Sequence, residues 1–354
     1  MPNQLKQRRS YLDVIRILAS FLVCFNHSEG YHIYLDQQAD GSLLSWLMVL
    51  IPAASRINLP MFIMITGALT LHREESYRNI GKKIGRFAVI ILAASLVKYS
   101  VDHPANFSLN EFIYGIFSCN INMSYWYLYA YIAYLLTQPF LHRIAVGMTG
   151  KDFVLLVMLR MLLLSILPLV NYALNCMGRE SIILLSQFQL PLSVLNIFFY
   201  PLIGYYLANV LVVEQMGKKQ RWGWFLVYLF CVAAATVVTY HEGMRGTFTQ
   251  SFITLFDYLC AIAIFIVLRS LLEKARFPEK LQKLLAAWSG FTFGIYVMEP
   301  LLATFFYIPF VDFAYQFHPI IRMGLSGVWC LFIIAAGSLL TWLLRKVPGC
   351  KKLL

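Results

Sequence analysis

Long apolar runs separated by short basic stretches dominate this chain of 354 residues. Each run holds about 18 to 25 residues, which is the length that an α-helix needs to cross roughly 30 Å of hydrocarbon. The pattern therefore predicts an all-α, polytopic membrane bundle of about ten transmembrane helices. In chain order, the expected spans lie near residues 11–33, 43–71, 87–101, 125–142, 152–173, 188–211, 222–240, 251–272, 288–311 and 321–344.

The composition agrees with a membrane domain. Apolar residues make up 60% of the chain and charged residues 13%, which is more apolar surface than a soluble core needs. The seven cysteines form no CxxC pair and mostly lie inside apolar runs, so they indicate neither a metal site nor a disulfide framework. We find no strong internal repeat, low-complexity tract or soluble segment. One transmembrane domain over residues 1–354 therefore accounts for the chain.

The basic residues orient the expected spans. Ten spans place both termini on one side, and the segments on that side carry most of the Lys and Arg residues, whereas the opposite loops hold only Arg179, Arg245 and Arg322. The positive-inside rule then predicts cytoplasmic N- and C-termini. This topology also explains the net charge of +12 without a nucleic-acid partner.

Ionisable residues inside spans are costly, so each must face protein, water or a ligand. The first span carries Asp13, Arg16 and His27 and lacks a small-residue cleavage site, so we expect a retained helix and not a signal peptide. Arg16 and His27 are separated by ten residues, which places them on roughly one helix face, about 16 Å apart.

Two interpretations of this face remain open. A fixed cation near the cytoplasm and a deeper histidine suit a protein that grips a phosphate-bearing donor and transfers a proton at mid-depth. Alternatively, Asp13 and Arg16 form an i, i+3 pair that snorkels to the inner surface, and His27 is hydrogen-bonded in the outer interface.

The second span is expected to bend at Pro52 and Pro60. Arg56 and Asn58 lie between these prolines and are candidate substrate-binding residues, because broken helices in membranes line cavities. The structural alternative for Arg56 is a salt bridge with one of the carboxylates at Asp13, Asp257 and Glu299.

Two further groups also have a functional and a structural interpretation. Lys82, Lys83 and Arg86 open the third span and would attract either nucleotide phosphates or anionic lipid head groups. Trp126 and Tyr127 open the fourth span at its outer end, where aromatic residues usually anchor a helix. We keep both aromatic residues as candidates for substrate binding.

Glu299 lies about midway along the ninth span, directly before Pro300, which is expected to disturb the helix. Its carboxylate could orient His27 during proton transfer, as in other carboxylate–histidine pairs. It could equally be the counter-ion of Arg56.

Taken together, these segments resemble the acyltransferase-3 family of bacterial polytopic acyltransferases. The first span has the family's order of Asp, Arg and His, with the Arg and the His ten residues apart. Thr66 stands where the family's PxFFxxSG segment usually has Ser. The similar segments occur in family order at residues 11–27, 60–67, 82–86, 126–139 and 293–296.

The resemblance implies an inner-membrane O-acyltransferase that moves an acetyl or other short acyl group from acetyl-CoA or another acyl-CoA to a hydroxyl of a surface glycan, glycolipid or small metabolite. It implies that His27 is the catalytic histidine and that Arg16 is the donor-site cation. Glu299 and Asp13 are further catalytic candidates from their own positions in the spans, not from the resemblance. The basic opening of the third span would be a further donor contact.

The expected location is the bacterial cytoplasmic membrane, and the expected partners are the lipid bilayer, the acyl-CoA and the acceptor. A homo-oligomer is left open, and no metal is expected. The family often has His at the position of Glu299, a departure compatible with a subgroup that uses a different acceptor. No serine or cysteine is obviously paired to a base, so direct transfer is favoured over an acyl-enzyme.

Two other functions are also considered from the sequence. One is a transporter or flippase, and the other is a non-catalytic relative that binds or exports a metabolite, as the membrane half of serine racemases is thought to do.

Overall fold

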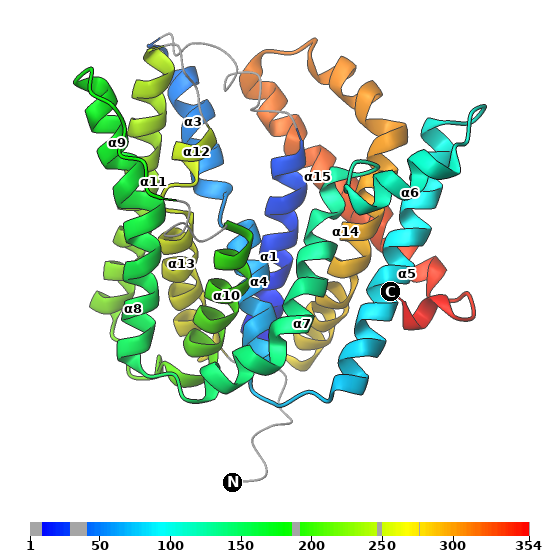
Figure 1. Cartoon of the computed structure of the whole chain (residues 1–354), viewed down its shortest axis with the longest axis horizontal. Helices are drawn as coiled ribbons and strands as arrows, with labels where there is room; N and C mark the ends of the chain where they lie inside the picture. Colours follow the sequence, from blue (N-terminus) through cyan, green and yellow to red (C-terminus); the bar gives the residue numbers. More distant parts are fainter. Residues whose placement is uncertain (1–8, 29–40, 186–191, 246–249, 276, 354) are drawn as a thin grey trace. The chain divides into compact units, whose positions relative to one another are not determined.

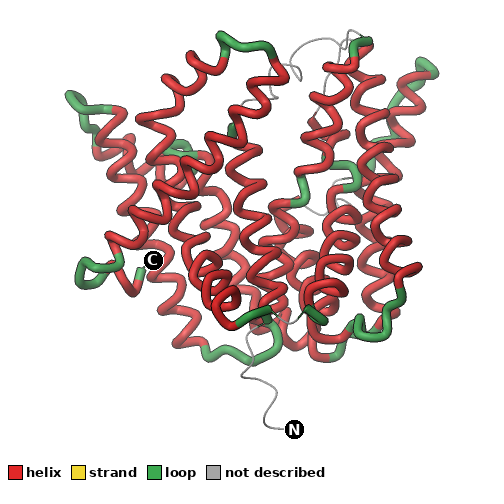
Figure 2. Tube along the Cα trace, turned by 180° about the vertical axis from the view of Figure 1, so that it is seen from behind, coloured by secondary structure: helices red, strands yellow, loops and turns green. Residues whose placement is uncertain are grey.

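The computed structural model describes residues 9–28, 41–185, 192–245, 250–275 and 277–353, and every regular element in these ranges is a helix (Figure 1, Figure 2). The predicted all-α class is confirmed. Most of the described residues in each of the ten predicted runs are helical, with interruptions at residues 56–57 and 254–256. The ends of two runs, at residues 29–33 and 188–191, lie outside the described residues.

The helices that occupy the predicted runs are α1 (Ser10–His27), α3 (Leu43–Ser55), α4 (Asn58–Thr70), α5 (Tyr77–Asp102), α7 (Trp126–Val146), α8 (Gly150–Met161), α9 (Leu167–Cys176), α10 (Leu192–Tyr205), α11 (Lys218–Met244), α13 (Asp257–Leu272), α14 (Glu279–Ala314) and α15 (Pro319–Leu344). A π-helical turn, Leu162–Ile166, joins α8 to α9, and a second one, Tyr206–Val210, follows α10. The shorter elements are α6 (Leu109–Phe117), α12 (Gln250–Ile253) and the 3-10 turns Met123–Tyr125 and Cys350–Lys352.

Six helical segments among the described residues are long and apolar enough to cross a membrane. They are Leu43–Thr70, Tyr77–Asp102, Gly150–Cys176, Lys218–Met244, Glu279–Ala314 and Pro319–Leu344. The remaining helices in the predicted runs are shorter or more polar. The membrane-helix character is thus supported, whereas the number of ten spans and the cytoplasmic position of both termini stay predictions.

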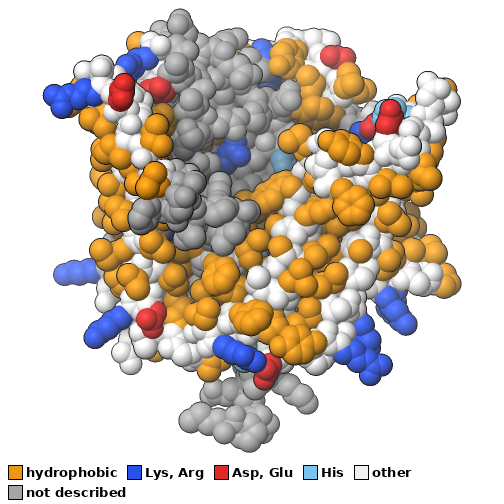
Figure 3. Space-filling view, in the orientation of Figure 1, with side chains coloured by type: hydrophobic (Ala, Val, Ile, Leu, Met, Phe, Trp, Pro, Cys, Tyr) orange, Lys and Arg blue, Asp and Glu red, His pale blue; other side chains and the backbone are white. Residues whose placement is uncertain are grey.

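Apolar side chains cover much of the surface drawn in Figure 3. Examples are Leu92 and Val97 on α5, which are 53% and 51% exposed, and Leu155 on α8, which is 66% exposed. A soluble protein would bury such side chains, so this surface is suited to contact with lipid.

The chain divides into two compact units. The first unit comprises the described residues within Met1–Ile15, Tyr31–Arg73 and Phe140–Arg276, and the second those within Arg16–Gly30, Glu74–Pro139 and Phe277–Leu354. Helix α1 therefore contributes its first turns to the first unit and Arg16 to His27 to the second.

In the first unit, the predicted break of the second span is present. Helix α3 ends at Ser55 and α4 begins at Asn58, so Arg56 and Ile57 interrupt the helix between the two prolines of the sequence pattern. The Arg56 backbone N–H still donates to the Pro52 carbonyl, at 3.1 Å, which closes the last turn of α3.

Two glycines allow α4 and α10 to pack backbone against backbone in the same unit. A Cβ atom on Gly67 would lie 2.0 Å from the Pro201 carbonyl oxygen, and one on Gly204 would lie 1.9 Å from that of Met64. Helices in membranes often associate through such small residues, because close approach maximises van der Waals contact. Gly67 is the last residue of the family-like segment at 60–67, so its place there has a packing reason.

We expect Gly67→Ala and Gly204→Ala each to destabilise the protein by about 1–3 kcal/mol, because the added methyl group meets backbone that cannot yield. The measurement is the midpoint of thermal unfolding of the purified protein in detergent. Gly81→Ala on α5 is the matched control, since nothing lies within 4 Å of its would-be Cβ. A midpoint for Gly67→Ala equal to that of Gly81→Ala would contradict the packing argument.

The second unit contains an equivalent close contact between α14 and α15. A Cβ on Gly294 would lie 2.2 Å from Oγ1 of Thr341, and Gly337 of α15 faces Ile295. Buried residues of α14 pack with residues of α1, α5, α7 and α15 in one hydrophobic cluster, which contains Cys24, Ile90, Ile91, Leu128, Ile295, Val297, Trp329 and Ile333. This cluster fixes α14 beside the end of α1, where His27 and Glu299 lie.

Candidate functional site

His27 and Glu299 lie within hydrogen-bond distance of each other in the second unit. Nδ1 of His27 lies 2.9 Å from Oε1 of Glu299. His27 is the last residue of α1 and its side chain is 35% exposed, whereas the side chain of Glu299, in the middle of α14, is only 5% exposed. A buried carboxylate is thus held against a histidine that remains accessible.

Helix α14 continues without interruption through Pro300, so the predicted disturbance is wrong. The physical reason is that the proline ring removes only one backbone N–H from a helix of 36 residues that packs along its length. Pro300 is itself buried, as is Leu302 two residues further on, so packing holds the helix in place.

A second contact joins the same two helices nearer to their N-terminal ends. An Arg16 guanidinium nitrogen, Nη1, donates to Oγ of Ser289 at 3.3 Å. His27 follows Arg16 by eleven residues on α1, and Glu299 follows Ser289 by ten residues on α14. At about 1.5 Å per residue, both separations are close to 15–16 Å, so the two helices run parallel with matched register.

Of the three predicted donor-site cations that open the third span, Arg86 comes closest to this arrangement. Its guanidinium lies 5.6 Å from the ring centre of Phe293, one turn after Ser289 on α14, and its Nε donates to the Leu353 carbonyl at 2.8 Å. Arg16 and Arg86 therefore both approach the stretch of α14 around residues 289–293.

Lys82 and Lys83, the other two predicted donor-site cations, are less closely tied to α14. Lys82 is exposed, and Lys83 pairs with Glu75 at 2.5 Å.

The two aromatic residues that open α7 differ. Trp126 is 45% exposed, as the interface interpretation expects. Tyr127 is half-buried, and its ring lies 5.7 Å from that of Tyr296 and 6.2 Å from that of Tyr131. Tyr131 and Tyr296, like Ser289, were not among the predicted site residues. Tyr131 could have been found from its i+4 spacing to Tyr127.

Three predicted site residues belong to the first unit. Asp13 and Asn58 are 6% and 8% exposed, and the Asn58 side-chain oxygen accepts from the Leu59 N–H at 2.7 Å. Arg56 is half-buried and interacts electrostatically with Asp257. Of the carboxylates considered for Arg56, the structure therefore brings Asp257 into range within the first unit.

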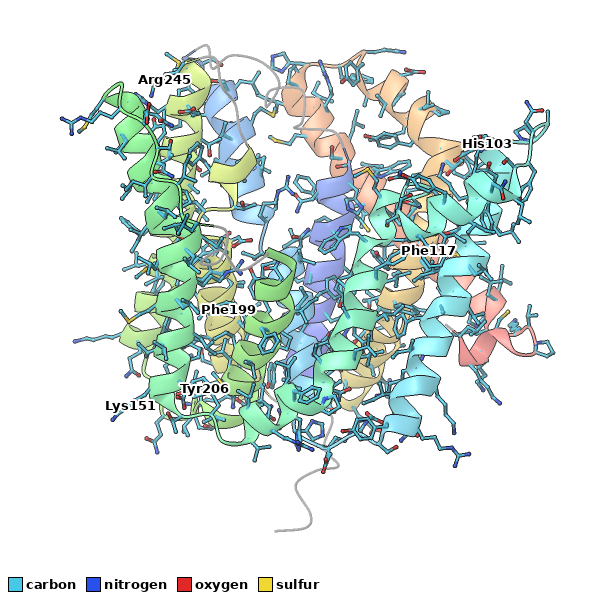
Figure 4. The ribbon with its side chains drawn as sticks, viewed as in Figure 1. His103, Phe117, Lys151, Phe199, Tyr206 and Arg245 are labelled. Atoms are coloured by element: carbon cyan, nitrogen blue, oxygen red, sulfur yellow. The ribbon has the colours of Figure 1, made fainter. Side chains whose placement is uncertain are left out.

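The first unit also holds a buried arginine cluster. A terminal guanidinium nitrogen of Arg160, Nη2, donates to the Tyr200 hydroxyl at 2.7 Å and lies 3.7 Å from Oδ1 of Asp257, and the other, Nη1, donates to Asn196 at 3.1 Å. The guanidinium also lies 5.0 Å from the ring centre of Phe199, which is labelled in Figure 4. Arg160 is only 3% exposed, so this network stabilises a charge that would otherwise be costly.

Among the described residues, no group of three or more His, Cys, Asp and Glu side chains is placed to hold a metal ion.

The fold and this pair define a helical membrane protein with an accessible, carboxylate-oriented histidine. Comparison with family models identifies it further, because the acyltransferase domain Acyl_transf_3 matches residues 9–344, nearly the whole chain. The chain belongs to this family, as the sequence resemblance predicted. No curated protein and no solved structure matches the chain.

Proposed function

We propose that the protein transfers an acetyl or other short acyl group from cytoplasmic acyl-CoA to a hydroxyl of a glycan, glycolipid or small metabolite at the bacterial cytoplasmic membrane. The observation that carries the proposal is the pair of contacts between α1 and α14. The His27–Glu299 pair lies three turns from Arg16, so one parallel helix pair offers a base at one end and a cation at the other. Membership of the acyltransferase family supports the reaction class.

Glu299 determines which histidine nitrogen can act as the base. When the His27 Nδ1–H donates to Glu299, Nε2 carries the free lone pair. Nε2 takes the proton of the acceptor hydroxyl while its oxygen attacks the thioester carbonyl carbon. The carbon–sulfur bond then breaks, and the CoA thiolate receives the proton from the His27 imidazolium, whose charge Glu299 stabilises.

Arg16 binds the donor in this mechanism. Its guanidinium pairs with a phosphate of CoA in a charge-assisted geometry, and Arg86 adds a second positive charge near the same stretch of α14. An extended pantetheine arm, with its two amide units, is long enough to reach from there to His27. The thioester then lies beside the base.

Free CoA provides the first test. We expect it to raise the midpoint of thermal unfolding of the purified wild type in detergent, because a ligand that binds only the folded state stabilises that state. Arg16→Ala is expected to weaken CoA binding by roughly 10- to 100-fold, the range for loss of a hydrogen bond to a charged group. The titration of midpoint against CoA concentration measures this change.

Arg179→Ala is the matched control, because Arg179 is an exposed arginine outside the site. Equal CoA titrations for Arg16→Ala and Arg179→Ala would contradict the role of Arg16. If the wild type shows neither a CoA shift nor acyl transfer or acyl-CoA hydrolysis, the acyltransferase proposal fails and a transporter becomes the better explanation.

A further inference from the structure

One face of α7 carries three tyrosines at helical spacing, Tyr127, Tyr131 and Tyr134. Neighbouring rings are in contact along this face. The ring centres of Tyr127 and Tyr131 are 6.2 Å apart, and those of Tyr131 and Tyr134 are 5.7 Å apart. We call these three residues the tyrosine face.

The tyrosine face reaches both ends of the proposed donor site. At one end, the Tyr127 ring lies 5.7 Å from that of Tyr296, which precedes Glu299 by less than one turn. At the other end, Tyr131 interacts electrostatically with both Arg16 and Arg86. Tyr127 and Tyr131 lie about 6 Å apart along α7, so one approaches the base and the other the cation at the two ends of the stretch of α14 between Ser289 and Glu299.

Anchoring at the membrane interface does not explain these residues. Tyr131 and Tyr134 lie about 7 and 12 Å beyond Trp126 along the helix, deeper than an interfacial belt of aromatic residues requires. Two of the exposed apolar side chains of α7, Leu136 and Phe140, lie on roughly the opposite side of the helix from the tyrosine face, at 100° per residue.

The chemistry of tyrosine suits a polar chain that crosses an apolar bundle. The pantetheine arm carries two amides, and each amide buried without a hydrogen bond costs free energy. A tyrosine offers an apolar ring for the methylene groups and a hydroxyl for an amide, which phenylalanine or leucine cannot do. Tyr127 and Tyr131 are half-buried and thus partly accessible, whereas Tyr134 is 3% exposed and its ring packs against that of Tyr131.

We propose that Tyr127 and Tyr131 form the wall against which the pantetheine arm of the acyl-CoA donor lies. The inference rests on the proposed acyl-CoA function and adds the residues that bind the part of the donor between its phosphates and its thioester.

The test compares two donors, an acyl-CoA and the matching acyl-pantetheine, which lacks the nucleotide and its phosphates. Tyr131→Ala should raise KM about tenfold for both donors with little change in kcat, since the arm is common to both. Arg16→Ala should raise KM for acyl-CoA only. Tyr131→Phe keeps the ring and its packing, and should fall between Tyr131→Ala and the wild type.

Tyr114→Ala is the control, because Tyr114 is a tyrosine of the second unit that is 70% exposed on α6. If Tyr131→Phe and Tyr131→Ala keep the wild-type KM for acyl-pantetheine while the wild type remains active, this inference is overturned and the proposed function stands. If both variants lower kcat and the unfolding midpoint without changing KM, the tyrosine face is structural and the inference is likewise overturned. A wild type that uses neither donor overturns the proposed function itself.

Discussion

Replacing His27 by alanine is expected to lower kcat for acyl transfer by roughly two to four orders of magnitude, the usual contribution of a general base. The side chain is 35% exposed and lies at the end of α1, so its loss leaves little cavity, and the unfolding midpoint should stay near that of the wild type. The measurement is release of free CoA thiol by the purified protein in detergent.

His103→Ala is the matched control. His103 is an exposed histidine of the second unit, and its side chain hydrogen-bonds to the carbonyl of Tyr99, four residues earlier in the chain. Glu299→Gln keeps the shape of the side chain but removes its charge. It should reduce kcat less than His27→Ala, because His27 is still present as a base, although the tautomer with the proton on Nδ1 is less favoured. Full turnover in His27→Ala would remove His27 from the mechanism.

Removing the carboxylate of Asp257 is expected to destabilise the first unit by about 3–5 kcal/mol, the cost of leaving a buried charge without its partner. Arg160 is 3% exposed, and its remaining partners, Tyr200 and Asn196, are neutral. The Asp257→Ala variant should therefore show a much lower midpoint of thermal unfolding in detergent, whether or not the enzyme is active.

The double variant Arg160→Met, Asp257→Leu should recover most of this loss, because apolar residues of similar volume replace a buried ion pair at little cost. Asp102→Asn on α5 is the comparison, since the Lys98–Asp102 pair is more exposed, with side-chain fractions of 20% and 33%. An exposed pair contributes at most about 1 kcal/mol. Equal midpoints for Asp257→Ala and Asp102→Asn would contradict a stabilising role for the Arg160 cluster.

Helices were the most predictable part of this fold, because apolar runs of membrane length have few other structures available to them. The break at Arg56 and Ile57 was also predictable, since it lies between two prolines. Sequence reasoning did not find the division into two compact units. That division depends on which helix surfaces pack together, and an apolar lipid-facing surface looks the same in sequence as an apolar packed one.

The candidate site was predictable only in part. The Arg16–His27 spacing defines one helix face, but the sequence left Glu299 with two partners, and the structure pairs it with His27. Ser289 gave no signal, because a serine near the start of a long helix is unremarkable until a distant arginine donates to it. Pro300 was expected to disturb α14 on a local rule, which packing overrides.

The π-helical turn Leu162–Ile166 changes the directions in which nearby side chains point from their helix. Arg160 lies 3.7 Å from Asp257, and the Ser165 hydroxyl donates to the Leu255 carbonyl at 2.5 Å, so two residues five positions apart meet the same short segment. In a regular α-helix these side chains would point about 140° apart. The hydrogen bonds of a π turn run from residue i to residue i+5, so the turn holds one residue more than an α-helical turn and reduces this angle. Arg160 and Ser165 can therefore both contact the short segment that contains Leu255 and Asp257.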